Sequence, residues 1–461
     1  MRIALCCLIL ITCFCARNLN AQIEESAFSA TGRGGTATTF VTDYQAIGIN
    51  PANLGFENDF GITLGIAEVG YSFYSDALLR DDVRAIIFNN DDTITQAEAE
   101  TIANAFVENG MAFNLNAMPL GLSFKIPKFG TIAFSYTANA TYHSTFGGSA
   151  PQIIFEGYDY AEYFDTVIVT PDEIYAVSYD PLSLSELFDG TDISFNAKSE
   201  INFAYGTEVV NSDKFNLYAG IGIKFIMSHA YLNFAAENGT ITGVSALGLD
   251  LLELTTSQTH PLTSSALQPV GTGWGFDLGS SIKIGESLTL GAAITDIGKV
   301  NYTANLLQLN DYVLDTLRFS GVTSTDPIQI IEQILSDENV VAYSGLSSFS
   351  ESLPTNFRLG ASLKLSDFVD VGVDGVFPLN DVAGSYVSPL FGIGGQVTLF
   401  EIIKPSIGIT SGGGYETSIP AGLTFDFKIW EAGVASRDIL TWFGEARPNV
   451  SFAFGFLRFK I

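Results

Sequence analysis

Histidine, serine and cysteine are the residues in this chain whose side chains could perform catalysis or bind a transition metal. None of the three histidines, His143, His229 and His260, stands two to four residues from another histidine or from a cysteine, which is the spacing of a zinc site. His143 precedes Ser144, but a catalytic triad forms in space, so this adjacency does not indicate one. We therefore expect a non-enzyme without a metal or a cofactor.

The cysteines lie together at the start of the chain, at positions 6, 7, 13 and 15. Arg2 precedes an apolar run over 3–16, and Ala21-Gln22 offers a small-residue cleavage site, so residues 1–21 are predicted to be a signal peptide. The exported chain would then contain no thiol and no disulfide.

An acidic and aromatic stretch is the next candidate for chemistry. Between residues 151 and 192 there are ten acidic residues and no Lys or Arg. Glu156, Asp159, Glu162 and Asp165 could bind a divalent cation or a protein partner, although their spacing matches no fixed calcium loop, and a solvated surface insertion is the alternative. The formal net charge of −29 disfavours binding to nucleic acid.

The stretch 214–228 shows most clearly which kind of element must position these residues. Apolar and mostly polar side chains alternate along it with a period of two. Its odd positions are apolar, and its even positions are mostly polar or glycine. A strand of this length extends roughly 40 Å, and a tilt of about 45° gives it a rise of roughly 30 Å, the hydrocarbon thickness of a bilayer. The residues that we predict to face lipid are Phe215, Leu217, Ile221, Ile223, Phe225 and Met227.

The same alternation recurs along the chain, at residues 120–126, 131–138, 274–284, 356–365 and 423–429. The second face of these strands carries Asp, Lys, Arg, Asn and Gly, which suits a wet or plugged lumen. We predict an all-β fold, a transmembrane antiparallel β-barrel in the bacterial outer membrane, whose oily face contacts lipid. A secreted β-sandwich or propeller also alternates and is the alternative.

Connections between the predicted strands fall into two length classes. Short polar turns are expected on the periplasmic side, and long outer loops near 143–192, 244–270 and 310–352. Thr95 and Glu98 form a capping box that predicts a helix over 96–107, at the periplasmic mouth or in the lumen. A second short amphipathic helix is expected over 326–336.

Residues 22–59 carry a resemblance to a known family. A Gly-rich start, Gly32-Arg33-Gly34-Gly35, is followed by Asn50-Pro51-Ala52, and this order resembles FadL-type outer-membrane transport proteins. Their relatives include the shuttle proteins of type IX secretion (PorV-like), to which residues 296–298 are also similar. The resemblance implies that 22–59 is an N-terminal hatch inside a barrel of about 14 strands formed by 60–461. The hatch residues that carry the resemblance are Gly32, Gly34, Gly35, Asn50, Pro51 and Ala52.

Two functions follow as hypotheses. By resemblance, the barrel would take up or transfer a hydrophobic small molecule, with movement of the hatch. The alternative is an outer-membrane component that binds secretion-machinery or surface proteins through its acidic and Tyr-rich loops, since Tyr-rich surfaces suit protein partners.

Overall fold

The computed structural model describes residues 26–56, 60–78, 94–248, 268–323, 342–413, 415–442 and 449–461. The predicted signal peptide, the predicted helix over 326–336 and His260 lie outside these residues, so the structure does not test them.

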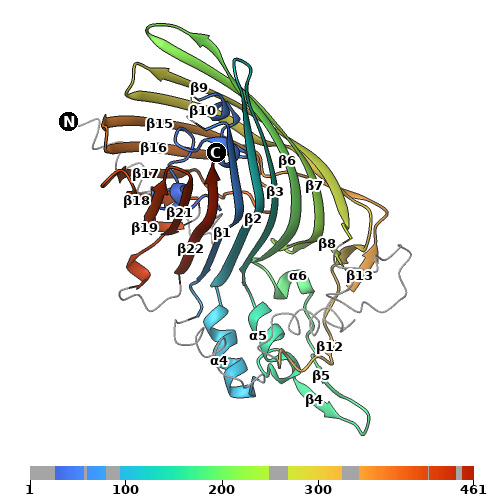
Figure 1. Ribbon diagram of the computed structural model, residues 1–461. Helices are drawn as coiled ribbons and strands as arrows, with labels where there is room; N and C mark the ends of the chain where they lie inside the picture. Colours follow the sequence, from blue (N-terminus) through green and yellow to red (C-terminus); the bar gives the residue numbers. More distant parts are fainter. Residues whose placement is uncertain are drawn as a thin grey trace, which may run out of the picture.

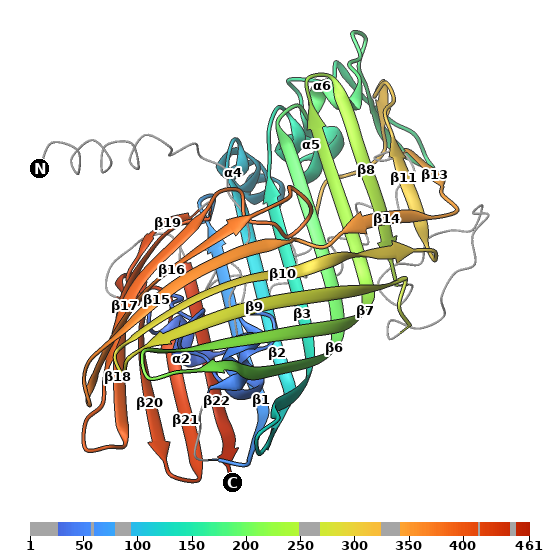
Figure 2. The same ribbon diagram turned by 90° about the horizontal axis from the view of Figure 1, so that it is seen from above.

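The described strands close into an antiparallel barrel, as the alternation predicted, and the wall has 14 strands, as the resemblance implied (Figures 1 and 2). Each strand pairs with the next one around the wall, and β1 closes the ring by pairing with β22. The wall strands, in order, are β1 (Ile62–Ser75), β2 (Gly110–Ile126), β3 (Gly130–Thr145), β6 (Thr191–Asn211), β7 (Phe215–Glu237), β9 (Gly271–Ile284), β10 (Leu288–Tyr302), β15 (Asn356–Ser366), β16 (Val369–Pro378), β17 (Leu390–Val397), β18 (Ile403–Gly412), β20 (Ala421–Phe427), β21 (Trp430–Ser436) and β22 (Asn449–Lys460).

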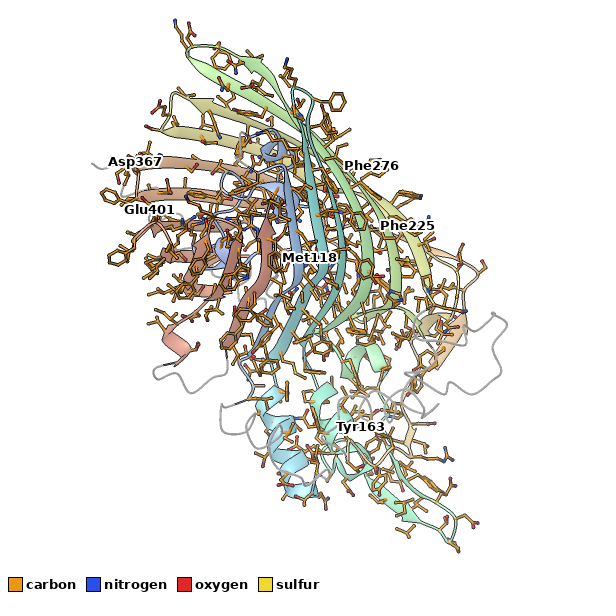
Figure 3. The ribbon with its side chains drawn as sticks, viewed as in Figure 1. Met118, Tyr163, Phe225, Phe276, Asp367 and Glu401 are labelled. Carbon is orange, nitrogen blue, oxygen red and sulfur yellow. The ribbon has the colours of Figure 1, made fainter. Side chains whose placement is uncertain are left out.

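The outside of this wall is apolar, and Figure 3 shows Phe276 on it. Ile221 of β7 is 58% exposed, whereas its neighbour on the other face, Gly222, is buried. Every wall strand presents at least one large exposed apolar residue, in order Ile66, Leu120, Ile132, Phe203, Ile221, Phe276, Leu290, Leu359, Val373, Ile393, Ile407, Phe425, Val434 and Leu457. Such a continuous apolar surface would be unfavourable in water. The barrel therefore belongs to the bacterial outer membrane.

Strand boundaries differ from the predicted ones where an irregularity was taken for a turn. Residues 111–117 and 119–127 alternate separately, which by itself would indicate two strands, yet both belong to β2, whose pairing with β3 shifts between Ala117 and Leu120. Likewise, the strand predicted over 214–228 does not end there but continues in the single strand β7 to Glu237. A β-bulge breaks the period of two without ending the strand, so it imitates a boundary in the sequence.

The two ends of the barrel differ. One end has short turns such as 212–214 and 367–368, and the other carries the long inserts. The inserts add strands to the sheet or form a separate small sheet beyond the wall, in the lower part of Figure 1. Those that extend the wall sheet are β8 (Thr240–Leu247), β11 (Leu306–Asn310), β13 (Ala342–Gly345), β14 (Phe349–Ser352) and β19 (Tyr415–Ser418), and the small sheet is β4 (Thr166–Val169), β5 (Ile174–Val177) and β12 (Thr316–Leu317).

Helix α4 (Gln96–Phe106) confirms the helix predicted from the capping box, because Thr95 N and Oγ1 donate to Glu98 Oε2 over 2.9 and 2.6 Å. These bonds lower the pKa of Glu98. Helix α4 connects β1 to β2 at the end with the long inserts, and its predicted place at the periplasmic mouth or in the lumen stays a prediction. There Phe106 stacks on Phe155 of α5 (Ala150–Phe155), with 5.5 Å between ring centroids.

Within the described residues, no helix combines the length and the hydrophobicity needed to cross a membrane.

Residues 26–56 lie inside the barrel, toward the end with the short turns (dark blue in Figure 2). They form three short helical turns, α2 (Phe28–Thr31), η1 (Asp43–Ala46) and η2 (Pro51–Gly55). Nearly all of their side chains are buried, for example Tyr44 and Leu54 at 1% exposure. We call residues 26–56 the hatch.

Candidate functional site

A belt of glycines on the inner face of the wall surrounds the hatch. A Cβ atom added at Gly220 would overlap Pro51, and one added at Gly65 would overlap the Tyr44 ring. Every wall strand except β3 contributes to this belt, whose members are Gly65, Gly121, Gly206, Gly220, Gly279, Gly291, Gly360, Gly372, Gly392, Gly394, Gly408, Gly422, Gly433 and Gly455. Because glycine has no side chain, the hatch backbone can pack directly against the wall.

Hydrogen bonds of the Asn-Pro-Ala signature connect parts of the hatch to one another and attach the hatch to β9. Asn50 Oδ1 accepts from the Ala52 N–H at 3.2 Å and so caps η2, while Asn50 Nδ2 donates to Ser281 Oγ at 2.9 Å. Asn53 Nδ2 donates to the carbonyls of Thr38 and Val41. Gly34 and Gly35 both have φ of +72°, a conformation that favours glycine. Asn50, Ala52, Gly34 and Gly35 thus have local structural roles, and the function of the six predicted hatch residues stays a prediction.

A buried ion pair also ties the hatch to the wall. Asp43 Oδ2 lies 2.5 Å from Nη2 of Arg458 on β22, and both side chains are less than 8% exposed. Arg458 also pairs with Glu431 of β21. Nearby, Tyr44 donates to Glu68 of β1 at 2.5 Å. A buried charge that loses its partner is costly, so these contacts hold the hatch against the wall.

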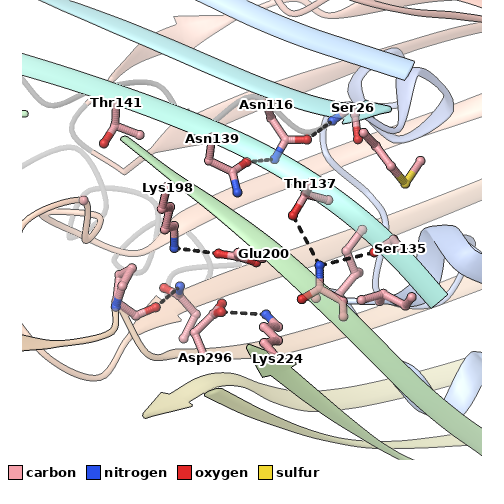
Figure 4. Close-up of a pocket in the computed structure, with 18 of the residues that line it drawn as sticks. Ser26, Asn116, Ser135, Thr137, Asn139, Thr141, Lys198, Glu200, Lys224 and Asp296 are labelled. Atoms are coloured by element: carbon pink, nitrogen blue, oxygen red, sulfur yellow. Dashed lines mark hydrogen bonds and ion pairs between the residues drawn. The ribbon is translucent and has the colours of Figure 1, made fainter. Parts of the chain in front are cut away.

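A cavity of about 200 Å³ lies between the hatch and the end with the long inserts (Figure 4). The hatch lines one side of it, for example with Gln45 and Ile47. Residues Gly384 and Tyr386, from the insert between β16 and β17, line another part. The cavity is therefore bounded by two segments that are not part of the wall, in addition to the wall itself.

The wall of this cavity is a ladder of amides and hydroxyls on neighbouring strands. We define the amide ladder as the inward side chains of β2, β3 and β6 that line the cavity, namely Asn114, Asn116, Ser135, Thr137, Asn139, Thr141, Asn196 and Asn202. The strand register places Asn116 opposite Asn139, and these two amides are hydrogen-bonded to each other. Asn116 Oδ1 also accepts from the Ser26 N–H at 3.0 Å, which connects the ladder to the hatch (Figure 4).

Charged residues in the cavity pair with one another. Lys198 lies 2.8 Å from Glu200 on the same strand, β6. Lys224 of β7 lies 2.6 Å from Asp296 of β10 and 3.1 Å from Asp277 of β9. Asp296 occupies a bulge in the β9–β10 pairing and has φ of +62°, a strained conformation for a residue other than glycine. The bulge allows its carboxylate to reach Lys224.

The acidic residues that we predicted as a cation or partner site are not brought together as a metal site. Within the described residues, no group of three or more His, Cys, Asp or Glu side chains could hold a metal ion. Partial burial raises the pKa values of Glu156 and Asp159. Glu162 is exposed, and Asp165 Oδ2 accepts from the Tyr179 N–H at 2.7 Å. Their role in binding a partner stays a prediction.

The six residues predicted to face lipid lie on the outer face of β7. Phe215, Ile221 and Ile223 are exposed, and the other three are partly covered by neighbours, as Phe225 is by the Trp274 ring at 5.0 Å. Lipid contact itself stays a prediction.

Sequence reasoning found the polar face of the wall but missed the cavity. The residues 196, 198, 200 and 202 of β6 are polar at every second position, a signal that could have identified this part of the lumen. These residues line the same cavity as Asp296 and Asn356, which lie on strands far from β6 in the sequence.

A family model matches residues 51–454, and it describes a family of unknown function, DUF5723. The chain belongs to this family. No curated protein matches the chain.

Several solved structures are similar to it. The Pseudomonas putida toluene transporter TodX is 12% identical with a TM-score of 0.41, and the match covers 96% of this chain and 98% of that one. The Ralstonia pickettii toluene transporter TbuX is 13% identical with a TM-score of 0.42, covering 96% and 99%. A Pseudomonas aeruginosa FadL homologue is 11% identical with a TM-score of 0.41, covering 95% and 98%.

Proposed function

We propose that this DUF5723 protein is a non-enzymatic outer-membrane barrel that transfers a small molecule through its lumen when the hatch moves. The observation that carries the proposal is the cavity inside the barrel, which lies between the hatch and the insert that connects β16 to β17. A cavity with convergent polar groups inside a barrel is a usual place for a ligand.

The hatch has the contacts expected of a closed but removable plug. It is held by side-chain hydrogen bonds and by the Asp43–Arg458 ion pair, and it packs on glycines that offer no interlocking side chains. Such an interface can separate without repacking of the wall. The resemblance implies a hydrophobic cargo, and toluene is the cargo that the descriptions of TodX and TbuX name.

Proteoliposomes test this proposal. We expect Asp43→Asn, which weakens the attachment of the hatch to Arg458, to increase the release of trapped solutes several-fold over the wild-type protein. Asp172→Asn changes an exposed carboxylate of an outer insert and is the matched control, which should leave release unchanged. Equal release from all three proteins would contradict the proposal.

A second candidate function, binding of a protein partner, is favoured by strand β4. In the described part of the chain, β4 pairs with β5 on one side and has no strand on the other. Val167 and Val169, on one of its faces, are 45% and 72% exposed. An exposed apolar edge strand is a common site for addition of an extended peptide.

The test for this candidate is cross-linking in the native outer membrane. A specific partner should be captured by the wild-type protein and by Asp172→Asn but lost in Val169→Asp, which places a charge on the edge strand. Identical capture by Val169→Asp would exclude β4 as the binding surface.

A further inference from the structure

We infer that the solute accommodated by the cavity is small, uncharged and rich in hydroxyl groups, as sugars and polyols are. This inference rests on the proposed function and specifies its substrate class. It departs from the hydrophobic cargo that the resemblance implies.

Unpaired acceptors in the cavity wall point to a ligand that donates hydrogen bonds. The side-chain oxygens of Asn196, Asn202 and Asn356 are buried and have no hydrogen-bond partner within the described structure, and all three residues line the cavity. Asn202 is 2% exposed and Asn356 is 6% exposed. A buried acceptor without a partner is unfavourable, so each oxygen needs a donor from water or from a ligand.

Orientation of the amide groups is set by the wall. Asn202 Nδ2 donates to Ser135 Oγ at 3.3 Å and to Thr137 Oγ1 at 3.2 Å, and Asn356 Nδ2 donates to the carbonyl of Pro354 at 2.8 Å. Because the NH₂ groups of both amides donate to the protein, the amide oxygens remain to accept hydrogen bonds from other donors. The site is therefore built to accept hydrogen bonds.

Both lysines of the cavity are paired with carboxylates and so do not favour an ionic ligand, and Arg358 is the third cation of the lining. Lys198 is neutralised by Glu200, and Lys224 by Asp277 and Asp296. Apolar side chains complete the lining, including Ile47, Ile49 and Tyr386. A sugar ring has C–H faces as well as O–H edges, so it matches a lining that combines apolar groups with hydrogen-bond acceptors.

The acceptors are too far apart for a single sugar ring. Asn196 and Asn202 are six residues apart on β6, which corresponds to roughly 20 Å along the strand. A sugar ring would therefore contact these acceptors one after another and not all at once.

Liposome swelling with four solutes tests the inference. The probes are D-glucose, its cationic analogue D-glucosamine, its anionic analogue D-gluconate, and toluene, whose entry is followed by absorbance of the separated vesicles. With Asp43→Asn as the protein, we expect D-glucose to enter faster than either charged analogue, and toluene to show no entry above that into protein-free vesicles.

Variants of the ladder sharpen the test. Asn202→Leu removes an acceptor and should slow D-glucose entry about three- to tenfold, the equivalent of one lost hydrogen bond. Asn211→Leu, on the same strand but outside the cavity, is the matched control and should have no effect. If Asn202→Leu fails to fold, Asn202→Asp retains the acceptor oxygen, replaces the NH₂ group with a second oxygen and adds a negative charge, so it should favour D-glucosamine over D-glucose.

The outcomes separate this inference from the proposed function. Entry of toluene alone, equal entry of all three sugars, or an unchanged preference in Asn202→Asp would overturn the substrate class and leave transfer through the lumen standing. Failure of all four solutes to enter through Asp43→Asn would overturn the proposed function as well.

Discussion

The two halves of the lumen share strands β2, β6, β7, β10 and β15, which carry different side chains in each half. Near the short turns, the inward positions are glycines, and the hatch backbone fills the space. Toward the long inserts, the inward positions of the same strands become Asn, Thr, Lys and Arg, and the space is a cavity. On β6, for example, Gly206 contacts the hatch and Asn202 lines the cavity. The size of the inward side chain therefore decides where the hatch sits.

The two halves of the lumen also differ in how their buried polar groups are hydrogen-bonded and paired. In the hatch half, charges and amides are paired across the interface, as in Asp43 with Arg458 or Asn50 with Ser281. In the cavity half, the charges are paired but amide oxygens are left without a partner. The first arrangement stabilises one conformation, and the second is suited to an exchangeable ligand.

The largest effect is expected from breaking the buried ion pair of the hatch half. Asp43→Asn should lower the free energy of unfolding by about 3 kcal/mol, because Arg458 loses a charged partner away from water. Urea unfolding in detergent micelles, followed by tryptophan fluorescence, measures the change. The control is Asp367→Asn, which breaks the exposed pair with Lys364 and should have little effect. Equal effects of the two variants would show that the hatch ion pair is not a major contact.

A smaller effect is expected from filling the glycine belt. Gly220→Leu places a side chain where Pro51 lies, and overpacking of this kind costs about 2 kcal/mol. We also expect the hatch to be displaced, so that trypsin cleaves after Arg33 in the folded barrel. Gly61→Ala, where the added Cβ has its nearest atom at 3.8 Å, is the control. Protection of Arg33 in Gly220→Leu would mean that the wall, and not the hatch, adjusts.

The smallest effect is expected in the cavity half. Thr137→Val removes a hydroxyl that accepts from Asn202 Nδ2, and it should cost about 0.5 kcal/mol because Ser135 still accepts from the same group. The hatch should remain protected from trypsin. A loss as large as that of Gly220→Leu would show that the amide ladder supports the fold and is not mainly a ligand surface.

The sequence by itself determined the wall. A period of two over long stretches can be satisfied only by strands with one apolar and one polar face, and this pattern predicted the barrel, its membrane placement and its inward polar face. Local signals also located α4, through the capping box of Thr95 and Glu98.

Tertiary structure decided which inward residues meet. The barrel closes by pairing β1 with β22, and this brings Arg458 to Asp43 although they are 415 residues apart. The cavity likewise combines β2, β3, β6, β7, β10 and β15 with the hatch, and its geometry depends on bulges such as that at Asp296, which the sequence does not reveal. Register, closure and bulges are properties of strand pairs, so a pattern read along one strand predicts its faces and not its partners.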